Sequence, residues 1–262
     1  MTPPTPTDIH CDGLVTRLKW HRARRTAADA PFTLDRIVEG LACGASVEID
    51  VRTGPGGEPV IRHDALRWWR RVPTRESTQL SAVGEALVDR GVTALPATAR
   101  LQLDIKDTAG VLTPAVAERI AVAVGSFADA VIVSGNDPVA VARIAGRDSR
   151  MATGHDPCTR SSVRRLRRAG DVDGFVTAAL DADRDARMIY LDRRIILAVA
   201  QTGTDIVSTF HAAEREVDAY TLEGPDTESL GQARALIDLG VDQITTDDPE
   251  GLFRALISVP RT

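Results

Sequence analysis

The sequence has few cysteines and no long apolar run. Its three cysteines are widely spaced among 262 residues, so they fit neither a disulfide framework nor a clustered zinc site, and we interpret them as reduced thiols. No stretch approaches the roughly 18 apolar residues that a membrane-spanning helix requires, and the first ten residues lack the basic start and apolar core of a signal peptide. We therefore expect a cytoplasmic protein without a membrane span.

The sequence also has no excess of basic charge. Its formal net charge is -5 and its pI is about 5.6. A protein with this balance has no global positive field to hold a nucleic-acid backbone or an anionic membrane. We therefore expect a small-molecule substrate and no nucleic-acid partner. The sequence indicates no particular oligomeric state.

Short β-branched runs alternate with segments of helical period along most of the chain. This alternation is typical of βαβ units, and the chain is long enough to bury a full-sized core. Strands are predicted at residues 14–20, 46–52, 100–105, 130–134, 150–153, 187–191, 217–222 and 242–246. Helices are predicted at residues 34–43, 80–90, 114–124, 138–145, 161–169 and 227–239. Eight such strands predict a (β/α)8 TIM barrel.

The ends of these elements carry further signals. Thr113-Pro114 and Asp137-Pro138 are typical of helix starts, because the fixed φ of proline suits the first turn. Residues 170–185 are compatible with either an extra strand or a loop. We expect one domain over residues 1–262, in which residues 1–8 form a disordered tail because they are rich in proline and threonine.

Two carboxylates stand at alternate positions of the second predicted strand. Glu48 and Asp50 therefore project to the same side of that strand, while their aliphatic neighbours face the other way. Asp104 and Lys106 repeat the pattern on the third strand. Carboxylates inside a barrel are costly to bury unless a cation neutralises them. Oxygen ligands favour Mg²⁺ or Ca²⁺, and the ammonium of Lys106 is suited to a phosphoryl oxygen.

Two histidines end strand-like runs. His21 closes the first predicted strand, and His63 follows a short apolar run after the acidic strand. In α/β barrels the carboxyl ends of the strands build the site, so these residues are candidates for general acid and base. Arg22 supplies a donor fork suited to phosphate oxygens, although a residue next to His21 on a strand would point away from it.

The chain resembles the glycerophosphodiester phosphodiesterase family in the order of its polar motifs. These motifs are His21-Arg22, Glu48-x-Asp50, His63-Asp64 and Asp104-x-Lys106. Near the far end, residues 219–222 are similar to the Trp-Thr-Val-Asn strand of the family. Residues 239–249 are similar to its closing Gly-Val-Asp-Gly-Ile-x-Thr-Asp-x-Pro. The resemblance thus spans nearly the whole chain.

This resemblance implies a TIM barrel with one divalent cation, Mg²⁺ or Ca²⁺. By similarity, the cation would be held by Glu48, Asp50 and Asp104. His21 and His63 would be the catalytic acid–base pair, in either order. Arg22, Lys106 and Tyr220 would contact the substrate and its phosphate. The implied reaction hydrolyses a glycerophosphodiester-like substrate of lipid metabolism to an alcohol and a phosphomonoester.

The chain departs from the family pattern at several positions. Ala23 replaces the glycine of His-Arg-Gly, residues 31–33 shorten the Pro-Glu-Asn-Thr motif, Asp104 replaces a glutamate, and Tyr220 replaces a tryptophan. The Asp104-x-Lys106 pair also resembles the sphingomyelinase D branch, which implies the alternative of a cyclising transfer on a specialised phosphodiester or phospholipid. The shortened motifs suggest a second alternative, a catalytically impaired barrel that binds a phosphorylated ligand.

Overall fold

Eight parallel strands close into a barrel in the computed structural model, which describes residues 7–11, 13–64 and 78–258. In barrel order these strands are β2 (Leu14–Trp20), β3 (Ser46–Thr53), β6 (Arg100–Ile105), β7 (Val131–Gly135), β8 (Ala152–His155), β9 (Met188–Asp192), β10 (Glu216–Leu222) and β11 (Gln243–Thr246). Closure comes from β2, which pairs with β11 on one side and, through Trp20 and Val47, with β3 on the other. The TIM barrel predicted from the sequence is confirmed.

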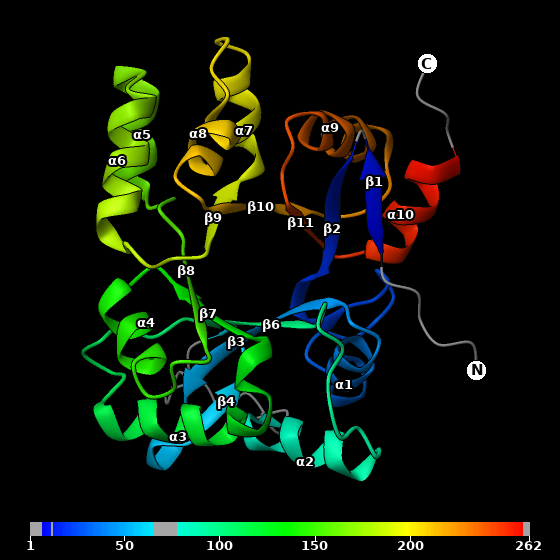
Figure 1. The fold of residues 1–262 in the computed structure, drawn as a ribbon, viewed down its shortest axis with the longest axis vertical. Coiled ribbons are helices and arrows are strands. Elements are labelled where there is room, and N and C mark those ends of the chain that lie inside the picture. The colour runs from blue at the N-terminus through cyan, green and yellow to red at the C-terminus, as the bar shows by residue number, and fades with distance from the viewer. Residues whose placement is uncertain (1–6, 12, 65–77, 259–262) are drawn as a thin grey trace.

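Helices surround the barrel and follow the strands in chain order (Figure 1). They are α1 (Leu34–Ala42), α2 (Ser81–Asp89), α3 (Pro114–Val124), α4 (Pro138–Ala145), α5 (Arg160–Ala169), α6 (Val172–Ala182), α7 (Arg193–Ala200), α8 (Ile206–Ala212), α9 (Thr227–Asp238) and α10 (Pro249–Ser258). Two of the predicted helix starts are capped as expected. Thr113 accepts a hydrogen bond from the amide of Val116, and Asp137 accepts from the amides at the start of α4.

The expectation of a strand or loop over residues 170–185 was wrong, because this segment contains α6. Asp171 begins the helix by accepting a hydrogen bond from the amide of Gly174. Phe175, Val176 and Ala179 are buried at helical spacing, so the segment stays helical by packing one apolar face.

Shorter antiparallel strands extend the barrel at two places. β1 (Asp8–Cys11) pairs with the start of β2. Thr7 and Asp8 are therefore not part of a disordered tail as expected, since Thr7 is buried and Asp8 is in the strand; residues 1–6 lie outside the described part. β4 (Pro59–Ile61) pairs with β3, and β5 (Thr78–Gln79) pairs with β4.

Among the described residues, none of the helices is long and apolar enough to cross a membrane.

The barrel interior differs from the apolar layers around it. Aliphatic side chains fill the space between strands and helices in two large clusters, one around β3, β6 and β7 and one around β9, β10 and β11. Inside the barrel, however, buried polar groups replace the branched apolar side chains that usually fill it. They include Lys19, Glu48, Asp50, Gln102, Asp218, Gln243 and Thr245. Buried polar groups of this kind are costly, so their presence marks the part of the fold that carries the site.

Candidate active site

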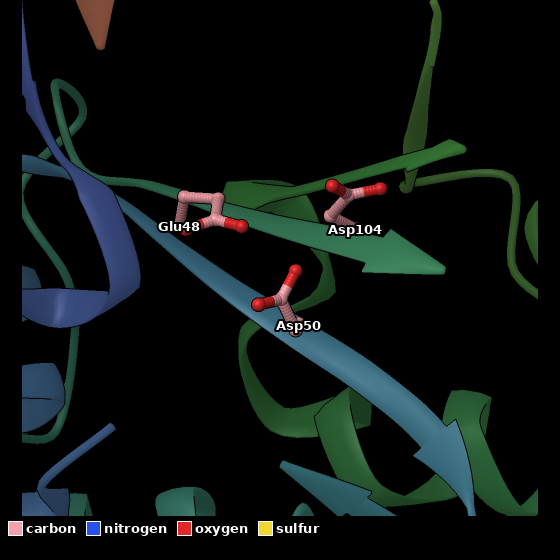
Figure 2. Close-up of side chains that lie close together, drawn as sticks. All are labelled: Glu48, Asp50 and Asp104. Atoms are coloured by element: carbon pink, nitrogen blue, oxygen red, sulfur yellow. The ribbon is translucent and has the colours of Figure 1, made fainter. Parts of the chain in front are cut away.

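Three carboxylates converge near the carboxyl ends of β3 and β6. Glu48 and Asp50 occupy alternate positions of β3, and Asp104 lies directly opposite Asp50 in the pairing with β6. One oxygen of each carboxylate lies within 4.8 Å of the others, and Figure 2 shows the three side chains facing a common space. Glu48 and Asp50 are only 4% and 1% exposed. The register of two neighbouring strands thus gathers three acids in one place, two of them buried and Asp104 partly exposed.

The charges around these acids are incompletely balanced. Burial, together with the negative charges of Asp50 and Asp104, raises the pKa of Glu48 well above its usual value. Lys106 places its Nζ 2.8 Å from Asp50 Oδ1 and 2.5 Å from Asp104 Oδ2. Burial alone would lower the pKa of Lys106, but the charges and hydrogen bonds of the two aspartates raise it, so the side chain is held as an ammonium.

The acids are suited to a hard divalent cation. Apart from the Lys106 ammonium, no described group lies within hydrogen-bonding distance of the Asp50 carboxylate, since Arg22 Nε is 3.6 Å from Oδ2. Glu48 accepts one hydrogen bond, from the backbone amide of Arg22 at 2.7 Å. Buried carboxylate oxygens with so few donors match the ligand preferences of Mg²⁺ and Ca²⁺.

A tight turn after β2 brings Arg22 to the same cavity. The chain leaves the strand at Trp20, and Arg22 and Ala23 adopt φ values of 53° and 57°. Arg22 is therefore no longer on the opposite side from His21, as a continuous strand would require. The left-handed conformation of Ala23 costs about 1–2 kcal/mol for a residue with a Cβ, which explains why glycine suits this position in the family pattern.

His21 is oriented by Asp247, the residue that directly follows the last strand, β11. Its Nδ1 lies 2.7 Å from Oδ1 of Asp247, which also pairs with Arg24 Nη1 at 3.1 Å. Burial alone would raise the pKa of Asp247, but the hydrogen bond from His21 and the positive charge of Arg24 lower it. A carboxylate on Nδ1 fixes the ring and leaves Nε2 available for proton transfer.

A cavity of about 270 Å³ opens beside these groups. Its lining includes six of the residues that the sequence predicted for the site: His21, Arg22, Glu48, Asp104, Lys106 and Tyr220. The volume is just below the usual range for drug-sized ligands, so the cavity fits a small polar molecule. A larger hollow of about 710 Å³ lies against α2, but its lining is mostly apolar and contains none of these residues.

Tyr220 lies on the wall of the cavity next to an acid that the sequence analysis did not identify. Its hydroxyl donates to the carboxylate of Asp156, 3.1 Å from each oxygen. Asp156 also accepts from the amide of Cys158 at 2.8 Å, and burial raises its pKa. The replacement of tryptophan by tyrosine is thus matched by an acceptor 64 positions away.

His63 is placed differently from the other candidates. It follows β4, its side chain is 46% exposed, and its Nδ1 lies 3.0 Å from Asp64 Oδ1. Its carbonyl oxygen accepts a hydrogen bond from Arg52 Nε at 2.7 Å. His63 is not among the residues that line the cavity. Asp50 does not line it either, but its carboxylate contacts Lys106 and lies within 4.8 Å of those of Glu48 and Asp104. The structure therefore brings together the predicted site residues except His63.

Five further polar residues, which lie deeper in the barrel than the three acids, were not predicted from the sequence. They are Lys19, Gln102, Tyr190, Asp218 and Thr245. A signal for two of them was present, because Gln102 stands two positions before Asp104 on β6 and Asp218 stands two positions before Tyr220 on β10. Alternate residues of a strand face the same side, so the polar faces extend one layer further inward.

No family model matches this chain, and no curated protein matches it. Solved structures do share its fold. A protein named as a glycerophosphoryl diester phosphodiesterase from Silicibacter pomeroyi superposes with a TM-score of 0.70 at 17% identity, covering 97% of this chain and 96% of its own. A glycerophosphodiester phosphodiesterase from Parabacteroides distasonis has a TM-score of 0.61 at 17% identity, covering 93% and 97%.

A third similar structure carries a ligand. It is an Oleispira antarctica phosphodiesterase in complex with the product sn-glycerol-3-phosphate, with a TM-score of 0.56 at 17% identity, covering 94% of this chain and 98% of that one. At this level of identity the comparisons establish the fold. The family resemblance seen in the motifs is therefore confirmed at the level of fold.

Proposed function

We propose that this protein is a divalent-cation-dependent phosphodiesterase that hydrolyses a glycerophosphodiester-like substrate to an alcohol and a phosphomonoester. One observation carries the proposal. Three carboxylates, from Glu48, Asp50 and Asp104, meet within 4.8 Å beside a small cavity. Three cationic or proton-carrying side chains, those of His21, Arg22 and Lys106, line the same cavity. The shared fold of the phosphodiesterases described above supports it.

Glu48, Asp50 and Asp104 would hold the cation, which we propose to be Mg²⁺ or Ca²⁺. When bound, it supplies Lewis-acid stabilisation of the charge that develops on the phosphoryl oxygens. A short aspartate in place of the family's glutamate fits the geometry here, because Asp104 already forms an ion pair with Lys106 at 2.5 Å. The Lys106 ammonium therefore offsets part of the negative charge of the three carboxylates on the side of β6.

Lys106 and Arg22 would bind the phosphate oxygens. Lys106 is held charged by its two aspartates. The Arg22 guanidinium is fixed only loosely, 3.6 Å from Asp50, so its donors remain able to turn to an anion. Tyr220, at the wall of the cavity, would contact the group carried by the phosphate.

His21 would transfer a proton through Nε2 while Asp247 holds Nδ1. We propose His63 as the second member of the acid–base pair. Its side chain is exposed, and Arg52 donates hydrogen bonds to the backbone carbonyl oxygens of both His63 and Lys106, which links the two segments. One of these two rings would accept a proton from the attacking water, and the other would donate a proton to the departing alcohol.

The test is hydrolysis of glycerophosphocholine followed by phosphorus NMR, with and without added Mg²⁺ or Ca²⁺. We expect metal-stimulated formation of a phosphomonoester. A cyclic phosphate as the final product would identify the cyclising reaction instead. Asp50→Asn should abolish the stimulation, whereas Asp35→Asn, a surface aspartate paired with Arg90, should not. No turnover with either metal on glycerophosphodiesters, lysophospholipids and bis(p-nitrophenyl) phosphate would refute the proposal.

The role of His63 needs a separate test. His63→Ala should lower kcat by roughly 10²–10⁴, as expected for a general acid or base. His211→Ala is the matched control, because His211 is also partly exposed and paired with an aspartate, Asp242, at 2.8 Å. Equal activity of the two variants would remove His63 from the mechanism.

A further inference from the structure

The floor of the cavity contains a buried lysine with unused donor capacity. Lys19 is 1% exposed and lines the cavity. Its Nζ lies 2.9 Å from Asp218 Oδ2 and donates to Gln102 Oε1. An ammonium carries three hydrogens, and no third acceptor for it occurs among the described residues. One donor of this buried group is therefore left for a molecule in the cavity.

A tyrosine beside Lys19 has an unused hydroxyl. Tyr190 lines the cavity, and its ring centroid lies 4.6 Å from Lys19 Nζ. The ring occupies space that exists only because residue 154 is glycine, since a Cβ at Gly154 would lie 2.6 Å from its Cε2. The hydroxyl has no hydrogen-bond partner in the described part of the chain, and the residue is 3% exposed.

A purely structural role explains the lysine better than it explains the tyrosine. Lys19 forms a buried ion pair with Asp218, which also accepts hydrogen bonds from Gln243 and Thr245. A buried hydroxyl without a partner, by contrast, costs about 1–3 kcal/mol, and phenylalanine would fill the same space without that cost. The hydroxyl is therefore the feature that points to a ligand.

The charge of the floor indicates the chemistry of that ligand. Lys19 and Asp218 neutralise each other at 2.9 Å, and the neighbouring Gln102 and Thr245 are neutral. The floor thus offers hydrogen bonds without net charge, whereas Arg22 and Lys106 at the upper part of the cavity are suited to an anion. A neutral hydroxyl fits the floor and a phosphate fits the upper part.

The separation of the two levels suits a three-carbon chain. Gln102, which accepts from Lys19, precedes Asp104 by two residues on β6, and two residues of a strand span about 6.6 Å. We propose that Lys19 and Tyr190 form a subsite that binds the terminal hydroxyl of the substrate's glycerol arm, which makes the protein selective for small polyol phosphodiesters. This inference rests on the proposed function for the position of the phosphate, and it assigns the specificity to residues of the floor.

The experiment is calorimetric binding of two phosphomonoesters in the presence of Mg²⁺. Glycerol 3-phosphate carries the terminal hydroxyl, and propane-1,2-diol 1-phosphate lacks only that group. We expect wild-type protein to bind the first roughly 10–100 times more tightly, the range for one hydrogen bond to a charged group. Tyr190→Phe should reduce this preference several-fold. It should also fold normally, since the hydroxyl makes no hydrogen bond to the described residues.

The matched control is Thr153→Val on β8. Thr153 also carries a buried hydroxyl without a partner among the described residues, but it does not line the cavity. We expect this variant to keep the wild-type preference. The subsite is refuted if wild-type protein binds both compounds equally or neither, if Tyr190→Phe keeps the full preference, or if Thr153→Val loses it.

Turnover measured on the same samples separates the two proposals. Metal-stimulated hydrolysis of glycerophosphocholine without a binding preference refutes the subsite and leaves the phosphodiesterase. A binding preference that depends on Tyr190, without any hydrolysis, supports the subsite and refutes the activity.

Discussion

Replacement of Glu48 by glutamine should have opposite effects on stability without and with a divalent cation. Glu48 is buried, with one oxygen within 4.8 Å of oxygens from Asp50 and Asp104. At that distance and an effective dielectric constant of about 20, two unit charges repel by about 3.5 kcal/mol. Lys106 and Arg22 offset much of this repulsion, so we expect the metal-free variant to be more stable than wild type by about 1–2 kcal/mol.

The divalent cation should reverse that order. A ligand at 100 times its Kd stabilises the folded state by about 2.7 kcal/mol. In a protein of this size that corresponds to a rise in Tm of roughly 5–10 °C. The Glu48→Gln variant loses one of three ligands and should gain much less. Thermal unfolding in EDTA and then in excess Mg²⁺ or Ca²⁺ measures both states, with Glu118→Gln, an exposed residue paired with Arg147, as the matched control.

The pH dependence gives an independent check of the same reasoning. The pKa of Glu48 is raised in the folded state above its ordinary value of 4.5. The folded protein therefore binds more protons than the unfolded chain between those two values, and metal-free stability should fall as pH rises through that window. Glu48→Gln should lack this decline. A variant less stable than wild type in EDTA, with an unchanged response to both cations, would refute the proposed repulsion and the metal site together.

Substitutions at four other points of the site have separable outcomes. His21→Ala should lower kcat by roughly 10²–10⁴ with little change in Tm; wild-type turnover would exclude proton transfer by this ring. Because the folded pKa of Asp247 lies below its ordinary 3.8, its stabilising contribution is complete above that pH and is lost as pH falls through the folded value. The difference in free energy of unfolding between wild type and Asp247→Asn, measured with urea, should therefore become smaller in acid. A difference that does not change with pH would contradict this. Lys19→Met alone or Asp218→Asn alone should lower the free energy of unfolding in denaturant by about 3–5 kcal/mol, because each leaves a buried charge without its partner. The double variant should lose less than the sum of the two single losses. Additive losses would argue against the buried pair. Lys106→Met should lower kcat/KM for glycerophosphocholine by roughly 10²–10³, and an unchanged value would remove its phosphate contact.

The local sequence pattern was sufficient to predict where the strands of the barrel lie. Each of the eight predicted strands overlaps an observed one, and residues 14–20 and 100–105 match β2 and β6 at both ends. Period-two alternation and turn residues are short-range signals, so a strand's existence and the face of each side chain can be read from a few neighbours. The segment 170–185 failed because its Asp- and Gly-rich ends resemble a loop, while its helical face is buried by packing from elsewhere in the fold.

For the site, the sequence by itself determined which residues share a strand face. The pairs Glu48 with Asp50 and Asp104 with Lys106 follow from strand geometry alone, and so does the acidic character of the site. Only the tertiary structure decided which strands meet. His21 and Asp247 are 226 positions apart and are joined because β2 and β11 are neighbours in the closed barrel.

Depth within the barrel was also decided only by the fold. Lys19 and Asp218 look like ordinary surface charges in the sequence, yet they form a pair in the interior, 2.9 Å apart. Tyr190 is likewise not distinguished by the sequence, because only its neighbours in the folded barrel set it apart from an ordinary tyrosine. Hydrogen-bond partners and burial depend on residues that barrel closure brings together from distant parts of the sequence. The local periodicity of the sequence does not predict these contacts. The sequence therefore specified the chemistry of the acidic face, and the closed barrel specified the cavity in which that chemistry could act.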